Sequence, residues 1–344
     1  MRKAHLLCVV LLAACPQLGS ADTSTDAAAH RVTFCVVADW QISDEHLTHL
    51  AERLVMEEPD FVLIPGDLVM ANGADPTPWE QFFDRIRPLL DAGTRLLPVP
   101  GNHDFDGGVS GARAQWIQQW DLPGAELFYS YDVGPVHVIG LCVSAGMFDE
   151  EFDLPEGRMT QHEWYIRDLE RSRDATWRFV YHHEPGAALC RFTGPAPGGD
   201  GTIMWGLPEV SEFVEPIAWR EGVDLMFRGH QHLYERTYPL NPERHVRDDL
   251  RGIALVTVGG GCVGYVPADP GDAVPLWFEA VVGIHQMHYL RIDIEGDVLR
   301  AEAKNLKGDV FDRFSIRKRP DGTRVWEGLP PSPVFLVENE PRSY

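Results

Sequence analysis

The chain has 344 residues with 52 acidic and 30 basic side chains, a formal net charge of −22 at pH 7. This balance disfavours long polyanions such as nucleic acid, because phosphate backbones are bound through cationic contacts. The length exceeds the ~250–300 residues at which one core stops growing, but two-sheet sandwiches of this size can form one domain, so we predict a single main domain.

The amino terminus has the two parts of an export signal. Basic residues follow the initial methionine and precede an apolar stretch that is too short to span a bilayer. The sequence Leu-Ala-Ala-Cys that ends at Cys15 resembles a bacterial lipobox, whose cysteine is lipidated after cleavage. We therefore predict a lipoprotein signal over 1–14, a membrane anchor at Cys15 and a flexible tether over 15–30. The alternative is an ordinary signal over 1–21, which would leave a periplasmic or secreted protein.

The elements that follow alternate between strands and helices. An apolar run at 32–38 predicts a strand, and the spacing of leucines predicts a helix over 44–57. A second strand at 61–65 and a second helix over 79–90 continue the alternation, and 95–100 predicts a third strand. This order is typical of a layered α/β fold.

The second half of the chain predicts further strands and a long loop. Helices are predicted at 112–120 and 160–171. Strands are predicted at 128–132, 136–143, 177–182, 223–227 and 253–258, and in an antiparallel tail over 287–316. Residues 186–209 are rich in Gly and Pro and predict a long loop, and loops of that length are often functional.

Five short polar clusters each follow an apolar run that predicts a buried strand. They are ADWQ at 38–41, GDL at 66–68, GNHD at 101–104, VYHH at 180–183 and GHQH at 229–232. The carboxyl ends of neighbouring strands converge on one crevice in an open α/β sheet, so these clusters predict one shared site. Their carboxylate, amide and imidazole groups suit Mn, Fe or Zn. The candidate ligands are Asp39, Gln41, Asp67, Asn102, His183, His230 and His232.

The same clusters suggest a hydrolytic mechanism. Asp67 is the candidate bridge between two cations ~3.5–4 Å apart, which lower the pKa of a bound water from ~15.7 to about 7 and so supply hydroxide. His103 is the candidate general acid, with Asp104 as its orienting carboxylate. Taken singly, Asp39 fits a helix N-cap and Asn102 fits a left-handed turn. Five clusters in one order make a shared site the better interpretation.

The ordered clusters resemble the calcineurin-like metallophosphoesterase superfamily, whose pattern is D-x-[H or G], G-D, G-N-H-[D or E], V-x-x-H and G-H-x-H. The stretches at 129–141 and 229–240 are similar to the purple-acid-phosphatase branch. The resemblance covers roughly 31–318 and leaves 319–344 as a carboxyl-terminal tail. It implies an α/β fold, a four-layer α/β/β/α sandwich with two central mixed sheets, and a site for two divalent metal ions at its crest.

Two residues depart from the family pattern. Purple acid phosphatases have a tyrosine three residues after the Asp of G-D, and its phenolate binds ferric iron and gives the colour. This chain has Met70 there, so we predict no purple absorption band and no requirement for Fe(III). The wider superfamily has the His of D-x-H, where this chain has Gln41. We therefore expect the cation held by Asp39, Asp67 and His232 to be bound less tightly than its neighbour.

The resemblance favours an exported phosphomonoesterase, similar to an acid phosphatase, that acts on a small phosphoester. Catalytic relatives commonly place a phosphate-contacting histidine in the loop after the V-x-x-H motif, and none occurs here between His183 and His230. Two alternatives therefore stay open. One is a phosphodiesterase for a nucleotide or lipid head group, and the other is a non-catalytic surface binding protein with one working metal position. The sequence leaves the oligomeric state open.

The remaining cysteines and histidines are assigned to structure. Cys35 and Cys142 lie in apolar runs and are predicted to be buried thiols. Cys190 and Cys262 lie in loops that follow site strands and are predicted to pair in an oxidising compartment. Four histidines without a motif role are assigned to packing: His137, His182, His285 and His288.

Overall fold

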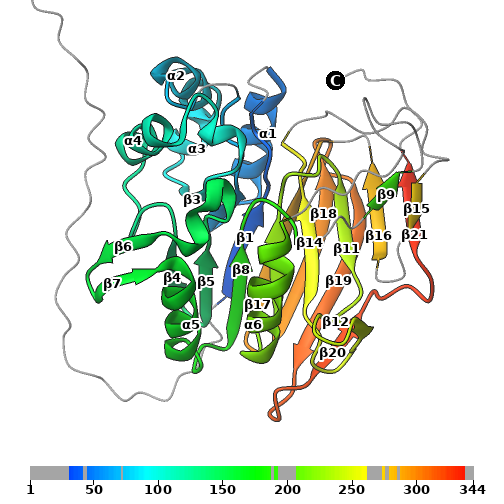
Figure 1. Ribbon diagram of the computed structural model, residues 1–344. Coiled ribbons are helices and arrows are strands. Elements are labelled where there is room, and N and C mark those ends of the chain that lie inside the picture. The colour runs from blue at the N-terminus through cyan, green and yellow to red at the C-terminus, as the bar shows by residue number, and fades with distance from the viewer. Residues whose placement is uncertain are drawn as a thin grey trace, which may run out of the picture.

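Two large mixed sheets pack against each other and carry helices on their outer faces in the computed structural model (Figure 1). This confirms the predicted four-layer α/β/β/α sandwich. The structure describes residues 31–41, 45–70, 73–186, 190–192, 207–261, 273–275, 279–284 and 287–337. The predicted signal, tether and lipid anchor at Cys15 lie outside these residues.

The first sheet has seven strands in the order β20-β19-β18-β17-β1-β2-β3. Its parallel part is β1 (Arg31–Val36), β2 (Phe61–Pro65) and β3 (Arg95–Val99). Its antiparallel part is β17 (His288–Glu295), β18 (Val298–Asn305), β19 (Val310–Lys318) and β20 (Arg324–Glu327). The parallel strands therefore point their carboxyl ends to one edge, the crest of the sandwich.

The second sheet has eight strands in the order β21-β16-β11-β14-β10-β8-β5-β4. The central parallel strands are β5 (Val136–Gly140), β8 (Trp177–Tyr181), β10 (Leu225–Arg228) and β14 (Ala254–Val258). The flanking strands are β4 (Tyr129–Val133), β11 (Tyr234–Thr237), β16 (Glu279–Ile284) and β21 (Val334–Val337). Strands β20 and β21 lie in the segment expected to be a tail, so the sheets extend beyond position 318.

Three short strand pairs accompany the two sheets. They are β6 (Glu151–Leu154) with β7 (Gly157–Thr160), β9 (Cys190–Phe192) with β15 (Ala273–Pro275), and β12 (Leu240–Asn241) with β13 (Val246–Arg247). The second of these joins the segment after β8 to the segment after β14.

Capping and proline chemistry explain the ends of α2 and α5, two of the six α-helices that the structure describes. The six helices are α1 (Glu45–Met56), α2 (Pro76–Arg85), α3 (Arg87–Asp91), α4 (Val109–Gln119), α5 (Gln161–Arg171) and α6 (Glu215–Arg220). Thr160 and Glu163 form a capping box that starts α5. The single helix predicted over 79–90 is two helices, because Pro88 has no N–H to donate and α2 ends before it.

Two apolar cores hold these layers together. Phenylalanines fill the space between the sheets, with the rings of Phe34 and Phe61 stacked at a centroid distance of 4.8 Å. A second core lies between the two sheets' outer faces and the helices that cover them, and it contains Trp40, Trp79 and Trp116, all buried. Each fully buried aromatic side chain contributes about 1.5–3 kcal/mol relative to an exposed one. Rigid layers on both sides therefore fix the strand ends at the crest.

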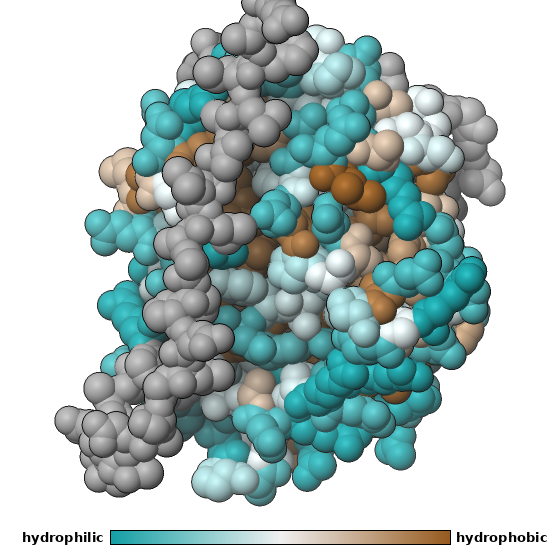
Figure 2. All heavy atoms as spheres, turned by 90° about the vertical axis from the view of Figure 1, so that its left-hand side faces the viewer, coloured by the Kyte–Doolittle hydropathy of each residue, from teal (hydrophilic) through white to brown (hydrophobic). Residues whose placement is uncertain are grey.

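The face that carries α2, α4 and the β6–β7 pair is mainly hydrophilic. Figure 2 shows hydrophobic residues there in separate spots among hydrophilic ones. Among the helices that the structure describes, none has the length and apolar character needed to cross a membrane.

Candidate metal centre

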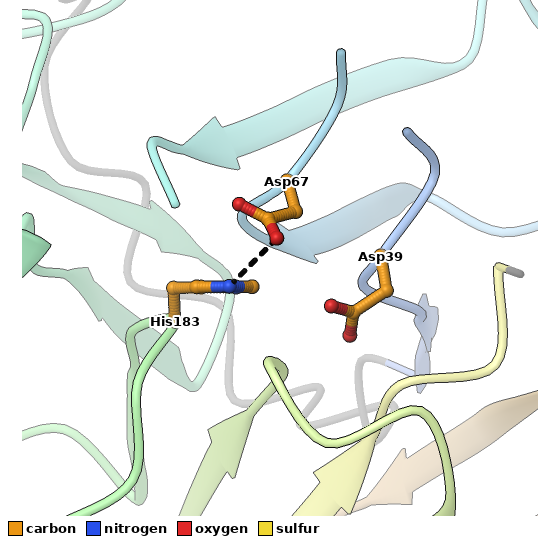
Figure 3. Close-up of side chains that lie close together, drawn as sticks. All are labelled: Asp39, Asp67 and His183. Carbon is orange, nitrogen blue, oxygen red and sulfur yellow. Dashed lines mark ion pairs between the residues drawn. The ribbon is translucent and has the colours of Figure 1, made fainter. Parts of the chain in front are cut away.

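The predicted ligands meet at the crest, where they follow the carboxyl ends of parallel strands from both sheets. Asp39 and Asp67 follow β1 and β2, and His183 follows β8 in the other sheet. Figure 3 shows these three side chains pointing toward one another. One ligand atom from each lies within 4.8 Å of the others. The structure therefore brings together residues that are more than a hundred positions apart in the chain.

Four predicted ligands form the first group of contacts. His183 Nε2 lies 3.1 Å from Asp67 Oδ2 and 3.2 Å from Asn102 Oδ1. His230 Nδ1 lies 2.8 Å from the same Asn102 oxygen. His183 Nδ1 contacts the Pro65 carbonyl oxygen at 2.8 Å, which fixes the ring so that Nε2 faces the site. One carboxylate, one amide oxygen and two imidazoles are thus available to one cation.

The second group is built around Asp39. His232 Nε2 lies 3.4 Å from Asp39 Oδ1, and the His230 backbone N–H donates to the same carboxylate at 3.1 Å. Gln41 is 3% exposed and contacts both His232 and Asp67.

The orientation of the Gln41 amide follows from its neighbours. Its nitrogen donates to the backbone carbonyls of Asp39 and Asp67, each at 3.2 Å, and its oxygen then faces His232 Nε2 at 3.1 Å. In this orientation the amide oxygen points into the ligand cluster. Gln41 therefore lies where a neutral oxygen ligand would be needed, although its sequence position normally carries histidine in the wider family.

Three of the predicted ligands have left-handed backbone. Asp39, Asp67 and His230 have φ values of 65°, 56° and 71°. Gly66 has φ 84°, and a Cβ there would lie 2.6 Å from His183 Nδ1. Non-glycine residues rarely adopt this conformation, and such strain clusters at functional sites. The strand exits are therefore folded sharply to make the side chains converge.

The buried carboxylates at the crest need positive charge. Burial would raise the pKa of Asp67, but the neighbouring His183 lowers it. Burial would lower the pKa of His183, and Asp67 raises it well above its ordinary value. In the metal-free protein a proton on His183 thus balances the carboxylate. The oxygen and nitrogen donors fit a divalent cation, and its binding would release this proton.

Asp104 does not orient His103, so that prediction is wrong. Its buried carboxylate accepts four backbone N–H groups, those of Asp67, Leu68, Val69 and Gly101, at 2.8–3.0 Å. Burial raises the pKa of Asp104, while these hydrogen bonds lower it. Asp104 therefore joins the exits of β2 and β3 and supports the backbone beneath Asp67.

The carboxylate that contacts His103 is Asp106. Their atoms Nδ1 and Oδ2 are 2.8 Å apart. Residues His103–Phe105 form a 3₁₀ turn, η1, in which side chains three positions apart lie on the same side. This spacing explains why Asp106, and not Asp104, faces His103, and the i, i+3 pair is the sequence signal that the earlier assignment missed. The His103 side chain is 36% exposed, and its backbone N–H donates to Asp67.

The residues assigned to structure lie outside the ligand cluster. His182 is buried, with Nδ1 2.9 Å from the Glu184 carbonyl oxygen, and His137 lies between Asp132 and Asp168. His288 is also buried, and His285 is outside the described residues.

The described cysteines agree with their assignment. Cys35 and Cys142 are buried thiols, as predicted. Cys262 lies outside the described residues, so its pairing with Cys190 stays a prediction.

The two mixed sheets with an oxygen and nitrogen ligand cluster at their crest define the class of metal-dependent phosphoesterases. Residues 32–234 match the family model for calcineurin-like phosphoesterases. The chain belongs to this family, and so to a class of phosphoester hydrolases, which confirms the prediction made from the five motifs.

Individual relatives support the purple-acid-phosphatase-like branch. The chain is 26% identical to purple acid phosphatase 21 of Arabidopsis thaliana over 241 residues. This alignment covers 67% of this chain and 50% of that protein. It is 25% identical over 299 residues to a nucleotide pyrophosphatase/phosphodiesterase of Hordeum vulgare, covering 78% of this chain and 75% of that one. A purple acid phosphatase from yellow lupin (Lupinus luteus) seeds has a similar fold, with a TM-score of 0.65 and 19% sequence identity. The superposition covers 86% of this chain and 55% of the lupin chain. The chain thus spans about half the length of the first of these relatives.

Proposed function

We propose that this protein is a metal-dependent phosphoester hydrolase whose favoured substrates are small phosphomonoesters. The observation that carries the proposal is the convergence of Asp39, Asp67 and His183, with ligand atoms within 4.8 Å of one another, at the crest of a phosphoesterase fold. Family membership supports the reaction class, and the ligand cluster supports this site for it.

The ligands would hold two divalent cations, which when bound would supply Lewis acidity and lower the pKa of a bound water. Asp67 belongs to both sets, because it lies beside His183 on one side and Gln41 on the other. Asn102, His183 and His230 complete one set. Asp39, Gln41 and His232 would complete the other, which we expect to hold its cation less tightly because the neutral amide of Gln41 lies where the wider family has histidine.

His103 moves the proton in this proposal. Its ring is partly exposed beside the ligand cluster, where it can reach a substrate, and Asp106 holds Nδ1 so that Nε2 is free to face the leaving oxygen. The backbone N–H of His103 donates a hydrogen bond to Asp67, which holds the proton donor at a fixed position relative to the metal ligands. A positioned general acid typically contributes about 10²–10⁴-fold to the rate.

A phosphodiester substrate is the second candidate. The barley relative is named a nucleotide pyrophosphatase/phosphodiesterase and shares the larger part of both chains. The absence of a histidine between positions 183 and 230 removes one expected monoester contact and leaves this candidate open. A non-catalytic binding protein is the remaining alternative, because Gln41 and Met70 replace two family ligands.

The cellular setting is part of the proposal. The amino-terminal signal and Cys15 support export and a lipid anchor, and the acidic charge supports a small substrate over nucleic acid. Incorporation of a labelled fatty acid into the full chain, lost in Cys15→Ala, would establish the anchor. Secretion without labelling would favour the ordinary signal.

The test combines metal analysis with turnover. We expect two metal ions per chain and hydrolysis of a chromogenic monoester faster than of a diester under Mn, Zn or Fe(II). His103→Ala should lower kcat by about 10²-fold or more with the metal content unchanged, and Asp106→Asn should give a smaller loss. One ion or none, without turnover of either ester, would refute hydrolysis and favour the binding protein.

A further inference from the structure

A charged cluster that the proposed mechanism does not use lies next to the metal ligands. Arg228 ends β10 and directly precedes the turn that carries His230. Its side chain is fully buried and contacts Glu215 Oε1 and Thr257 Oγ1, each at 3.5 Å. Arg228 Nε has no hydrogen-bond partner within the part of the chain that the structure describes. A guanidinium with so little exposure cannot contact a substrate, so any role in the reaction is indirect.

Glu215 connects Arg228 to the other histidine-bearing turn. It is the first residue of α6 and accepts the backbone N–H of Gly186, three residues after His183. A Cβ on Gly186 would lie 2.9 Å from Glu215 Oε1, so the backbone packs directly on the carboxylate. The turns after β8 and β10 are therefore tied together through one ion pair.

Thr257 connects Arg228 to the loop beneath Asp39. It lies in β14, which continues into Gly259–Gly261. The Gly261 N–H donates to the Ala38 carbonyl at 2.9 Å, and a Cβ on Gly259 would lie 2.8 Å from Asp39 Oδ2. The same guanidinium thus contacts Glu215 and Thr257, which connect it to the segments beside His183 and Asp39.

We propose that Arg228 is a positioning residue for the metal centre: together with Glu215 and Thr257, it holds the turns that carry His183 and His230 at the separation that their shared ligand set requires. The proposal rests on the proposed function in that it assumes a metal centre at these ligands. A buried ion pair adds little net stability over an apolar pair of similar volume. We therefore expect the Arg228–Glu215 pair to fix the positions of the turns. Lysine cannot replace Arg228, because one ammonium group lacks the planar fork with which the guanidinium reaches two partners.

Variants of Arg228 and Glu215 distinguish a role in positioning the metal ligands from a role in balancing buried charge. Arg228→Met leaves Glu215 buried without its cation and should lower the melting temperature of the metal-free full chain. The double variant Arg228→Met with Glu215→Gln removes both charges of this pair and should recover part of that loss, since Arg228 also lies near the buried Glu235. Its Mn²⁺ affinity, measured by equilibrium dialysis, should stay about 10- to 100-fold weaker than wild type, the loss typical of residues that orient metal ligands. Arg228→Lys should show the same weakening with a smaller thermal effect.

A matched control is the buried pair of Arg236 and Asp312, which are 2.7 Å apart between the sheets. Arg236→Met with Asp312→Asn should change the melting temperature and leave Mn²⁺ affinity unchanged. Wild-type Mn²⁺ affinity in the Arg228/Glu215 double variant would overturn the proposal. The readout of this experiment is Mn²⁺ binding and not turnover. If the wild-type protein binds Mn²⁺ without turnover, the proposed hydrolase is refuted, and the Mn²⁺ affinities of the variants still decide the role of Arg228.

Discussion

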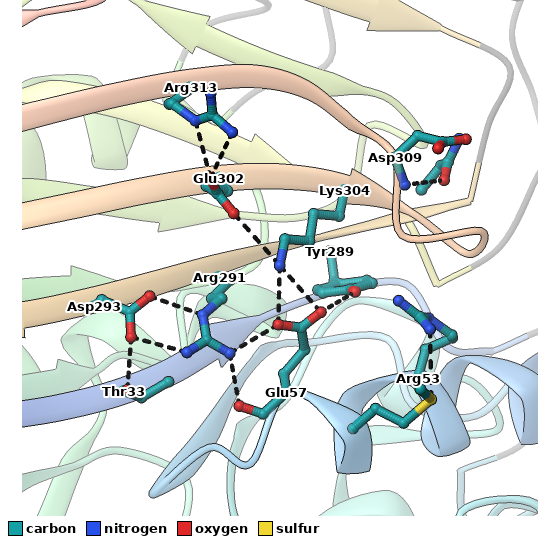
Figure 4. Close-up of polar contacts among 12 residues, drawn as sticks. Thr33, Arg53, Glu57, Tyr289, Arg291, Asp293, Glu302, Lys304, Asp309 and Arg313 are labelled. Carbon is teal, nitrogen blue, oxygen red and sulfur yellow. Dashed lines mark hydrogen bonds and ion pairs between the residues drawn. The ribbon is translucent and has the colours of Figure 1, made fainter.

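Two groups of buried carboxylates in this molecule are neutralised in different ways. On the outer face of the first sheet, Glu57 accepts hydrogen bonds from Tyr289 at 2.6 Å, Arg291 at 2.8 Å and Lys304 at 3.0 Å (Figure 4). Arg291 also bonds Asp293, so each acid has a cationic partner from the chain itself. Burial would raise the pKa of Glu57, but these hydrogen bonds lower it.

At the crest, Asp39 and Asp67 are more deeply buried but contact imidazoles, backbone N–H groups and an amide. Within the described ranges, no lysine or arginine forms an ion pair with either. The comparison shows that lysine and arginine side chains neutralise a carboxylate where that carboxylate stabilises the fold. Where it supplies only imidazole, the charge balance is left to a proton or to a metal ion.

The largest effect should come from Asp67→Asn, which removes the carboxylate shared by both ligand sets. Metal affinity should fall by more than about 100-fold, beyond the loss typical of residues that only orient ligands, and turnover should fall with it. The metal-free protein should also unfold at a lower temperature, because His183, whose pKa Asp67 raises, loses its buried carboxylate partner. Metal content and calorimetry of the same preparation check this, and full metal occupancy would contradict the shared role.

A smaller effect, in stability only, should come from Glu57→Gln. The change leaves Arg291 and Lys304 without their shared carboxylate, but both are partly exposed and can be hydrated. We expect a loss of about 1.5–3 kcal/mol in the free energy of unfolding, the range for hydrogen bonds to charged groups. Urea unfolding measures it, with metal content as the control. Loss of metal in this variant would remove the distinction between the two regions.

The smallest effect should be a pH dependence from His137. Burial would lower its pKa, but hydrogen bonds to Asp168 and Asp132, at 2.8 and 2.7 Å, raise it. A folded pKa above the unfolded value of about 6.5 means that the contribution is fully present below that pH and is lost as pH rises through the folded pKa. His137→Gln should therefore flatten the stability profile above pH 6.5, as measured by urea unfolding across pH. An unchanged slope would mean that His137 is neutral in the fold.

The sequence predicted the layers and the ligands because both signals are local. An apolar run followed by a polar cluster indicates a strand and the residues directly after it. Because the carboxyl ends of parallel strands lie at one edge of a sheet, the residues that follow different strands meet there. Asp39, Asp67 and His183 were found in this way. The helix over 79–90 was misjudged because its apolar pattern continues through Pro88, whereas its hydrogen bonds do not.

Contacts set by three-dimensional geometry could not be predicted in this way. Asp104 and Asp106 are both carboxylates close to His103, and only the 3₁₀ turn decides which one faces the ring. The pair of Arg228 and Glu215 joins a strand to a helix, and neither residue has a motif around it. The amide of Gln41 is oriented by two backbone carbonyls, a contact that exists only after the loops have converged.

The left-handed backbone at Asp39, Asp67 and His230 has a consequence for engineering this protein. Each such residue costs about 1–3 kcal/mol of folding free energy, a cost that glycine would not carry, because it adopts positive φ freely. The same replacements would delete three ligands. At these three positions relief of backbone strain and metal binding therefore require different residues, a stability–activity trade-off built into the strand exits.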